Sequence, residues 1–418
     1  FIVVATVFWF LSRTRTGKSM RAYSNNPDLA LISGIDPNRV VFIAWVITAG
    51  LAAIAGSLYG LDKSYKPLVF LHLVLPVFAA AILGGVGSPL GAIVGGFVIA
   101  FSELFITFAY KKVAAYLLGE GALGDGLLQL LSTDYKFAVS FRDPSDCIAG
   151  QANWNLQREI NMSFLFGKFY QIQLGLKLLP NLQRNSILAG IMACLLAIVG
   201  FSQSWNLAFS LLNMCLISAI MALGVNIQWG YAGLFNAGVM GFAALGGLAA
   251  VLIAVDPVEA AWAAGGRGLL FGFSIGVLTT YIAIFAWKRL RNSRLKRYWV
   301  TILILIIGFS AMRFFTDPAT LAIEAVDAAK SGYLGGLGMP IMFSWIVGGL
   351  LAACVAWLVG KISLGLRSDY LAIATLGISE IIIYFLKFED WLTRGVKNVN
   401  GLPRPVPYEI NLQNEAWF

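Results

Sequence analysis

Long apolar runs separated by short charged segments constrain the fold of this chain more than any other feature. They lie at residues 1–11, 40–60, 69–85, 91–110, 187–201, 208–227, 232–253, 269–286, 299–312, 340–359 and 370–385. Several approach the length of about 20 apolar residues that an α-helix needs to cross a bilayer. A segment in hydrocarbon must satisfy its own backbone hydrogen bonds, which favours helices. The pattern therefore predicts an all-α, polytopic transmembrane helical bundle.

The composition excludes an ordinary soluble domain. The 418 residues are 59% hydrophobic and 12% charged, and the mean hydropathy is +0.78. Soluble domains carry about 25% charged residues. The 44 glycines fit close helix packing in lipid, where small residues let backbones approach. The net charge of +9 comes from basic residues between the apolar runs, which indicates cytoplasmic loops rather than binding of nucleic acid.

Metal and cofactor chemistry are not expected. His72 is the only histidine, and no two cysteines form a CxxC pair. A histidine-based metal site is therefore not expected, and nothing else in the sequence indicates a cofactor or a catalytic residue.

The first polar segment, residues 12–39, has the features of a cytoplasmic loop that carries a short helix. Its basic residues are Arg13, Arg15, Lys18, Arg21 and Arg39. Asn26 followed by Pro27 predicts a helix start, with Asn as the N-cap and Pro at the first helical position. A helix from Pro27 to about Gly34 would place Ala30 and Gly34 on one face. Such a face fits a groove of a partner protein, although an ordinary solvated loop has the same features.

The apolar part that follows contains a glycine-rich stretch and one carboxylate. A glycine-rich stretch spans residues 84–96 and includes Gly85 and Gly87. Glu103 follows it inside an apolar run. A carboxylate at membrane depth usually faces a bundle interior or an aqueous path, but it also serves as a structural partner for a nearby backbone or basic group. The residues alone leave both interpretations open.

These two segments resemble one permease type of the branched-chain amino-acid ABC transporters. The residues that carry the resemblance are Arg21-Ala22-Tyr23-Ser24-Asn25-Asn26-Pro27, Ala30 and Gly34-Ile35, and then Gly84 to Ala92 with Gly95, Gly96 and Glu103. In that family the loop couples the permease to an ATP-binding subunit. The resemblance therefore implies an ATPase-coupling role for Arg21, Ala22, Asn26, Pro27, Ala30, Gly34 and Ile35.

The second half of the chain resembles a second permease type of the same transporters. The resemblance rests on Trp229 to Gly238 with Gly241-Phe242 and Gly246-Gly247, on Arg367 to Gly377 with Glu380, and on residues 393–403. That type usually has serine where this chain has Asn236. The glycine-rich part is expected to interrupt its own helix, and broken helices are where transporters place polar groups and exposed backbone. A translocation path or simple close packing are the two interpretations for Gly85, Gly87, Glu103, Tyr231, Gly233, Asn236 and Gly238.

The basic run at residues 288–297 is expected to lie in the cytoplasm. A surface that meets anionic lipid headgroups explains it better than a nucleic-acid site.

A polar stretch at residues 142–161 separates the two halves. When permitted codons for it are read one base later, they encode an apolar helix and an Arg-Pro-Thr-Gly-type tail, as the resemblance to the first permease type requires. We therefore interpret residues 1–141 as the C-terminal part of one permease unit and residues 162–418 as the N-terminal part of another. The hypothesis is a single-base frameshift that fuses two reading frames. The alternative is a genuine hydrophilic linker.

Together these resemblances imply the membrane-spanning component of an ABC importer for branched-chain amino acids. They imply ATP-binding subunits, a periplasmic solute-binding protein and a complementary permease subunit as partners, and a multi-pass location in the bacterial inner membrane among its lipids. Urea, short amides or sugars are the alternative cargo. An ATP-independent channel or a membrane-embedded enzyme would need more ionisable residues at membrane depth. The chain is expected to lack parts of both units and not to transport alone.

Overall fold

The computed structural model describes residues 2–104, 181–202, 204–290, 294–327, 332–363, 368–395 and 397–405. The polar stretch at residues 142–161 lies outside them. Within the described ranges the chain forms helices, and its β pairing consists of two isolated bridges, Tyr65 with Val399 and Pro257 with Gly335. This arrangement confirms the predicted all-α fold class.

The helices follow one another along the chain in a simple order. They are α1 (Ile2–Arg13), α2 (Arg15–Asn25), α3 (Pro27–Ile32), α4 (Pro37–Lys63), α5 (Val69–His72), α6 (Val74–Gly84), α7 (Pro89–Leu104), α12 (Asn181–Ser202), α13 (Trp205–Asn226), the π-helical turn η3 (Ile227–Tyr231), α14 (Val239–Ala254), α15 (Glu259–Ala261), the π-helical turn η4 (Trp262–Gly266), α16 (Arg267–Arg289), α17 (Arg294–Ala325), α18 (Met342–Ser363), α19 (Ser368–Phe388) and α20 (Asp390–Thr393).

Six helical stretches of the described residues are long and apolar enough to cross a membrane. They are Pro37–Lys63, Trp205–Tyr231, Glu259–Arg289, Leu295–Ala325, Met342–Ile362 and Tyr370–Phe388. The apolar run at residues 232–253 is only partly helical, because residues 233–238 leave the helical conformation before α14 begins. The protein is therefore a multi-pass membrane protein with an interrupted helix in its second half.

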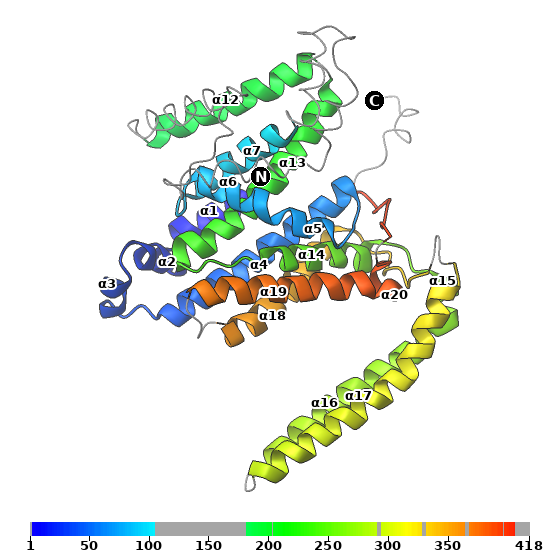
Figure 1. Ribbon diagram of the computed structural model, residues 1–418. Helices are drawn as coiled ribbons and strands as arrows, with labels where there is room; N and C mark the ends of the chain where they lie inside the picture. The colour runs from blue at the N-terminus through cyan, green and yellow to red at the C-terminus, as the bar shows by residue number, and fades with distance from the viewer. Residues whose placement is uncertain are drawn as a thin grey trace, which may run out of the picture.

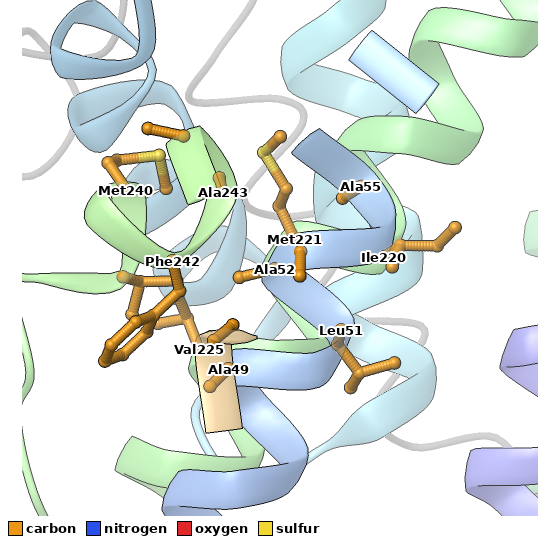
Figure 2. Packing of buried hydrophobic residues seen from close by; sticks show 14 of the residues in the cluster. Ala49, Leu51, Ala52, Ala55, Ile220, Met221, Val225, Met240, Phe242 and Ala243 are labelled. Atoms are coloured by element: carbon orange, nitrogen blue, oxygen red, sulfur yellow. The ribbon is translucent and has the colours of Figure 1, made fainter. Parts of the chain in front are cut away.

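Residues from both sides of the polar stretch share one hydrophobic core. Helix α4 runs through the bundle and packs against α13, α14 and α18 (Figure 1). Figure 2 shows this core from close by, with alanine and leucine side chains of α4 between side chains of α13 and α14. The largest buried cluster includes Trp45, Met221 and Met240, which are 2% exposed or less. The two halves of the chain therefore form one packed unit.

Small residues set the spacing of these helices. The backbone of Gly56 lies against Ala243, and that of Gly246 lies against Ala53, so that a Cβ atom on either glycine would collide with backbone atoms. The Ser57 hydroxyl donates a hydrogen bond to the Gly246 carbonyl oxygen at 2.7 Å. Such close approach provides van der Waals contact, which matters because lipid supplies no hydrophobic driving force for association between helices.

Helices α16 and α17 form a hairpin that projects from the bundle (Figure 1). Their apolar windows are only 17% and 11% buried, which fits contact with lipid. Within the hairpin, Gly268 and Gly272 face Ala319 and Thr316 across the interface. The two long helices are thus held together by a row of small residues.

The loops at one end of the bundle contact one another. Loops after α4, α14 and α20 meet at one end, where Tyr65 and Val399 exchange backbone hydrogen bonds of 3.1 and 3.0 Å and the Val258 N–H donates to the Leu334 carbonyl oxygen. The hairpin starts and finishes at this end, so its basic tip lies toward the other end, as do α2 and α3. The tip includes Arg297, whose guanidinium lies 3.7 Å from the centre of the Trp287 ring.

Candidate functional site

The start of the short loop helix α3 follows the sequence prediction. Asn26 is extended, and its side-chain oxygen accepts a hydrogen bond from the Leu29 N–H at 3.0 Å. Pro27 occupies the first helical position, where its missing N–H removes no helical hydrogen bond. This capping confirms the predicted helix start.

The end of α3 differs from the prediction. The helix stops at Ile32, and Gly34 has a φ angle of +81°. The Ile35 N–H donates to the Ala30 carbonyl oxygen and the Gly34 N–H to that of Leu31, both at 3.0 Å, which is a Schellman end with glycine in the left-handed conformation. Ala30 is 3% exposed, whereas Gly34 is exposed. The predicted shared face of Ala30 and Gly34 is therefore wrong, because the helix ends between them.

The exposed surface of α3 is apolar. Leu29, Leu31 and Ile32 are 60%, 51% and 84% exposed, although they lie outside the six apolar spans. Exposed apolar residues grouped on a polar loop commonly mark an interaction site. Of the other predicted loop residues, Arg21 and Ala22 are exposed and Ile35 is half-buried.

The first glycine-rich segment makes a tight turn between α6 and α7. Gly85 and Gly87 have φ angles of +91° and +87°, values that side chains other than glycine rarely adopt. Gly84 and Gly91 lie so close together that a Cβ atom on either would collide with the backbone of the other. Two of the predicted site residues, Gly85 and Gly87, thus shape this turn.

Asn226, the last residue of α13, holds this turn from the other half of the chain. Its Oδ1 atom accepts a hydrogen bond from the Gly87 N–H at 2.6 Å, and its Nδ2 atom donates to the Ser88 carbonyl oxygen at 2.6 Å. The side chain is 1% exposed. The Asn226 side chain therefore uses both its donor and its acceptor to connect the end of α13 to the first glycine-rich turn.

Gly230 completes the contact and connects it to the loop helices. A Cβ atom at Gly230 would lie 2.6 Å from the Gly87 Cα atom, so the two backbones touch because neither has a side chain. The Ser24 hydroxyl of α2 donates a hydrogen bond to the Gly230 carbonyl oxygen at 2.6 Å. We call Ser24, Gly87, Ser88, Asn226 and Gly230 the glycine junction. It joins the loop helices to both glycine-rich segments.

The predicted interruption of the second glycine-rich segment is confirmed. After η3, residues 233–236 are not helical, and Gly233 has a φ angle of +67°. Asn236 is 3% exposed; its Oδ1 atom accepts from the Gly238 N–H at 2.8 Å, and its Nδ2 atom donates to the Gln228 Oε1 atom at 3.1 Å. Tyr231, at the end of η3, is 6% exposed. The break therefore contains a small buried amide network.

An aromatic cluster lies against this break. The ring centres of Phe78 and Phe235 are 4.8 Å apart, and those of Trp229 and Phe235 are 4.9 Å apart. Glu103, by contrast, lies in the last turn of α7 and is half-buried; none of the hydrogen bonds that define the junction involves it. The structure therefore places Gly85 and Gly87 in the turn after α6 and places Tyr231, Gly233, Asn236 and Gly238 at the helix break, while Glu103 belongs to neither group.

Sequence reasoning did not name Asn226 and Gln228, and it did not single out Ser24, Ser88 and Gly230 within the segments that carry the resemblance. Asn226 and Gln228 are amides inside an apolar run, and polar residues in a membrane segment usually have a specific partner. That signal was available. Among the described residues no group of three or more His, Cys, Asp or Glu side chains is placed to hold a metal ion.

Comparisons with known proteins agree with this layout. The family described as the permease component of branched-chain amino acid transport systems matches residues 1–123. The chain is 32% identical over 107 residues to the probable branched-chain amino acid transport permease protein LivH of Methanocaldococcus jannaschii, which is 26% of this chain and 34% of that protein. It is 32% identical over 123 residues to LivH of Escherichia coli, which is 28% of this chain and 40% of the relative.

A second permease type matches a different region. The chain is 31% identical over 112 residues to the high-affinity branched-chain amino acid transport system permease protein LivM of Escherichia coli, which is 27% of this chain and 26% of that protein. No solved structure matches the chain. The chain spans between a quarter and two fifths of the length of these relatives. Residues 1–123 are therefore similar to the permease component of branched-chain amino acid transport systems, and the two permease types are matched in separate regions.

Proposed function

We propose that this chain is a membrane-spanning permease component of an ABC importer for branched-chain amino acids. The observation that carries the proposal is the family match of residues 1–123, because that range contains the loop helices and the first glycine-rich turn. The relatives named for branched-chain amino acid transport support the cargo. Such a component performs no covalent chemistry and offers alternating access to its cargo, driven by ATP hydrolysis in partner subunits.

The exposed side of α3 is the surface we assign to the ATP-binding partner. Leu29, Leu31 and Ile32 offer apolar contacts on a helix that is fixed at both ends by its caps. A rigid helix transmits a displacement by the ATP-binding partner better than a solvated loop does. The remaining proposed partners are a periplasmic solute-binding protein and a complementary permease subunit, and the location is the bacterial inner membrane.

The glycine junction connects the loop helices mechanically to the helices of the bundle. Helix α2 is bound to Gly230 through the Ser24 hydroxyl, and Gly230 touches the turn that Asn226 holds. A displacement of the loop helices would therefore reach the interrupted helix and the first glycine-rich turn together. Hydrogen-bonded and packed elements of this kind carry coupling between distant sites.

The test is assembly and uptake with the proposed partners. The chain is co-expressed with the ATP-binding subunits, the solute-binding protein and a complementary permease, and uptake of labelled leucine is measured beside uptake of urea and ribose. ATP-dependent uptake of leucine is expected. Uptake of urea or ribose instead would replace the proposed cargo, and uptake that persists without the ATP-binding subunits would favour a channel.

A surface variant tests the docking helix separately. Ile32→Ser is expected to reduce copurification of the ATP-binding subunit, because it removes the most exposed apolar side chain of α3. Ile2→Ser is the control, since Ile2 is 83% exposed but lies on α1. Equal copurification of both variants would contradict the assignment of this surface.

The composition of the chain from two permease units is also a proposal. We infer that residues 1–141 and 162–418 derive from neighbouring genes fused by a frameshift within residues 142–161. Sequencing of the source DNA between the codons for Phe141 and Met162 is expected to show one extra or one missing base. An intact single frame would contradict the frameshift and leave a genuine linker.

A further inference from the structure

The first turn of α14 is buried within the bundle. Helix α14 has 16 residues, and Gly238 at its N-cap has no side chain that could accept hydrogen bonds from the first turn. The first N–H groups of an α-helix have no partners within the helix, and the helix dipole makes this end positive. Helix starts of this kind favour negatively charged groups.

Two buried side chains near this turn hold polar atoms without hydrogen-bond partners. Among the residues that the structure describes, the Gln228 Nε2 and Ser379 Oγ atoms have no hydrogen-bond partner. Each side chain is 1% exposed, so bulk water does not reach these atoms. A buried donor without a partner is costly and is often explained by a ligand or a functional role.

Both side chains converge on the first turn of α14. Gln228 is bonded through Oε1 to Asn236, and Asn236 accepts the hydrogen bond of the Gly238 N–H that precedes the helix. On the other side, the Ser379 Oγ atom lies 3.0 Å from the position that a Cβ atom of Gly241 would take. The Gln228 amide, the Ser379 hydroxyl and the N–H groups of the first turn are able to donate, except that the Gly241 N–H already donates to the Gly238 carbonyl oxygen at 3.2 Å.

We propose that the first turn of α14, together with Gln228 and Ser379, binds the carboxylate group of an aliphatic amino acid. This inference rests on the proposed function and names the group of the cargo that the permease recognises. A carboxylate accepts several hydrogen bonds and carries the charge that a helix start favours. Interrupted membrane helices use their N-terminal ends in this way for anionic substrate groups.

The surroundings suit an aliphatic side chain attached to this carboxylate. Phe235 immediately precedes Asn236 in the interrupted segment and packs against Phe78 and Trp229. Gly238 lies directly against the Thr375 carbonyl oxygen of α19, which leaves no room for a ligand at this point. Entry of the ligand therefore requires α14 and α19 to separate, as alternating access demands.

The experiment is equilibrium binding of labelled L-leucine to the full chain in lipid nanodiscs. Ser379→Ala is expected to weaken leucine binding about tenfold, the loss for one hydrogen bond to a charged group. It removes a hydroxyl without a partner, so thermal stability should not fall. Ser344→Ala is the matched control, because Ser344 is equally buried and its hydroxyl donates to the Ile341 carbonyl oxygen at 2.6 Å.

The charge of the ligand is tested in two ways. Gln228→Glu replaces the donor by a carboxylate and is expected to abolish leucine binding. Leucinamide, which keeps the side chain but lacks the carboxylate, is expected to compete with leucine at least about tenfold less well. Urea, as an uncharged acceptor, is expected not to compete.

The outcomes separate this inference from the proposed function. Leucine binding that is unchanged by both Ser379→Ala and Gln228→Glu would overturn the subsite, and so would leucinamide competing as well as leucine. Absence of saturable leucine binding by the unaltered chain would overturn it too, even if the assembled transporter imports leucine. A chain that binds leucine as described, in an assembly that does not import it, would keep the subsite and refute the proposed function.

Discussion

Replacement of Asn226 by alanine is the most direct test of the glycine junction. The side chain makes two hydrogen bonds of 2.6 Å to the backbone of Gly87 and Ser88. One hydrogen bond contributes about 1 kcal/mol net, and about 0.6 kcal/mol on average in a membrane protein. The loss of both bonds therefore lowers the local stability by about 1–2 kcal/mol. This free energy corresponds to a factor of about 5–30 in the population of the opened turn.

Hydrogen exchange at the Gly87 amide measures this population. The amide exchanges only when its bond to Asn226 opens, so Asn226→Ala should accelerate exchange by about 5–30-fold. Glycine-selective labelling and NMR in detergent resolve this amide from its neighbours. Asn226→Asp retains the acceptor for the Gly87 N–H and loses the donor to Ser88, so its effect at Gly87 should be smaller.

The control for this prediction lies on the same helix. Asn213 of α13 is exposed, so Asn213→Ala should leave the exchange rate of Gly87 unchanged. Unchanged exchange in Asn226→Ala would refute the assignment of Asn226 as the group that holds the turn. Equal acceleration in Asn213→Ala would show a general loosening of α13 instead.

Three further predictions concern other contacts. Gly230→Ala should lower the thermal unfolding temperature, because its Cβ atom would collide with the Gly87 backbone. Gly50→Ala is the control and should not lower it, because nothing lies within 4 Å of the added atom. Equal shifts of the two unfolding temperatures would contradict the close contact. Ser24→Ala should lower leucine uptake per ATP hydrolysed in the assembled transporter while the ATPase rate persists, and parallel loss of both would indicate failed assembly. Burial raises the pKa of Tyr65 above its ordinary value of 10.0, so above about pH 10 this phenol ionises in the unfolded chain but not in the folded one, and the folding stability falls as the pH rises further. Because this hydroxyl has no hydrogen-bond partner among the described residues, Tyr65→Phe should stabilise the protein by about 1–2 kcal/mol. It should also reduce the loss of folding stability at alkaline pH, as measured by urea or thermal unfolding. Unchanged unfolding curves at alkaline pH would contradict this explanation.

The helical architecture could be predicted because lipid leaves a membrane segment few alternatives. Apolar runs of membrane length must satisfy their backbone groups internally, and the runs at residues 40–60 and 208–227 lie in helices α4 and α13. The start of α3 could also be predicted, since an Asn-Pro pair determines a helix start locally. The predicted end of α3 is wrong because glycine at Gly34 allows either a helical or a left-handed backbone.

The contacts within the site could not be predicted from local pattern. Asn226 lies 139 residues from Gly87, and Ser24 lies 206 residues from Gly230. Which residues meet over such separations depends on how the helices pack, and no local rule specifies it. The sequence identified both glycine-rich segments as important but offered no reason to place them against each other.

The packing of the two halves explains why those segments meet. Helix α4 presents Ala53 and Gly56 where α14 presents Gly246 and Ala243, and each glycine admits the opposing backbone. This fit places α4 and α14 in contact, and the Thr48 hydroxyl of α4 donates to the Gly224 carbonyl oxygen of α13 at 2.8 Å. With α13 fixed against α4, Asn226 at its end reaches the turn after α6. The glycine junction is therefore a consequence of small-residue packing in the core, and a change that separates α4 from α13 would also disconnect the loop helices from the interrupted helix.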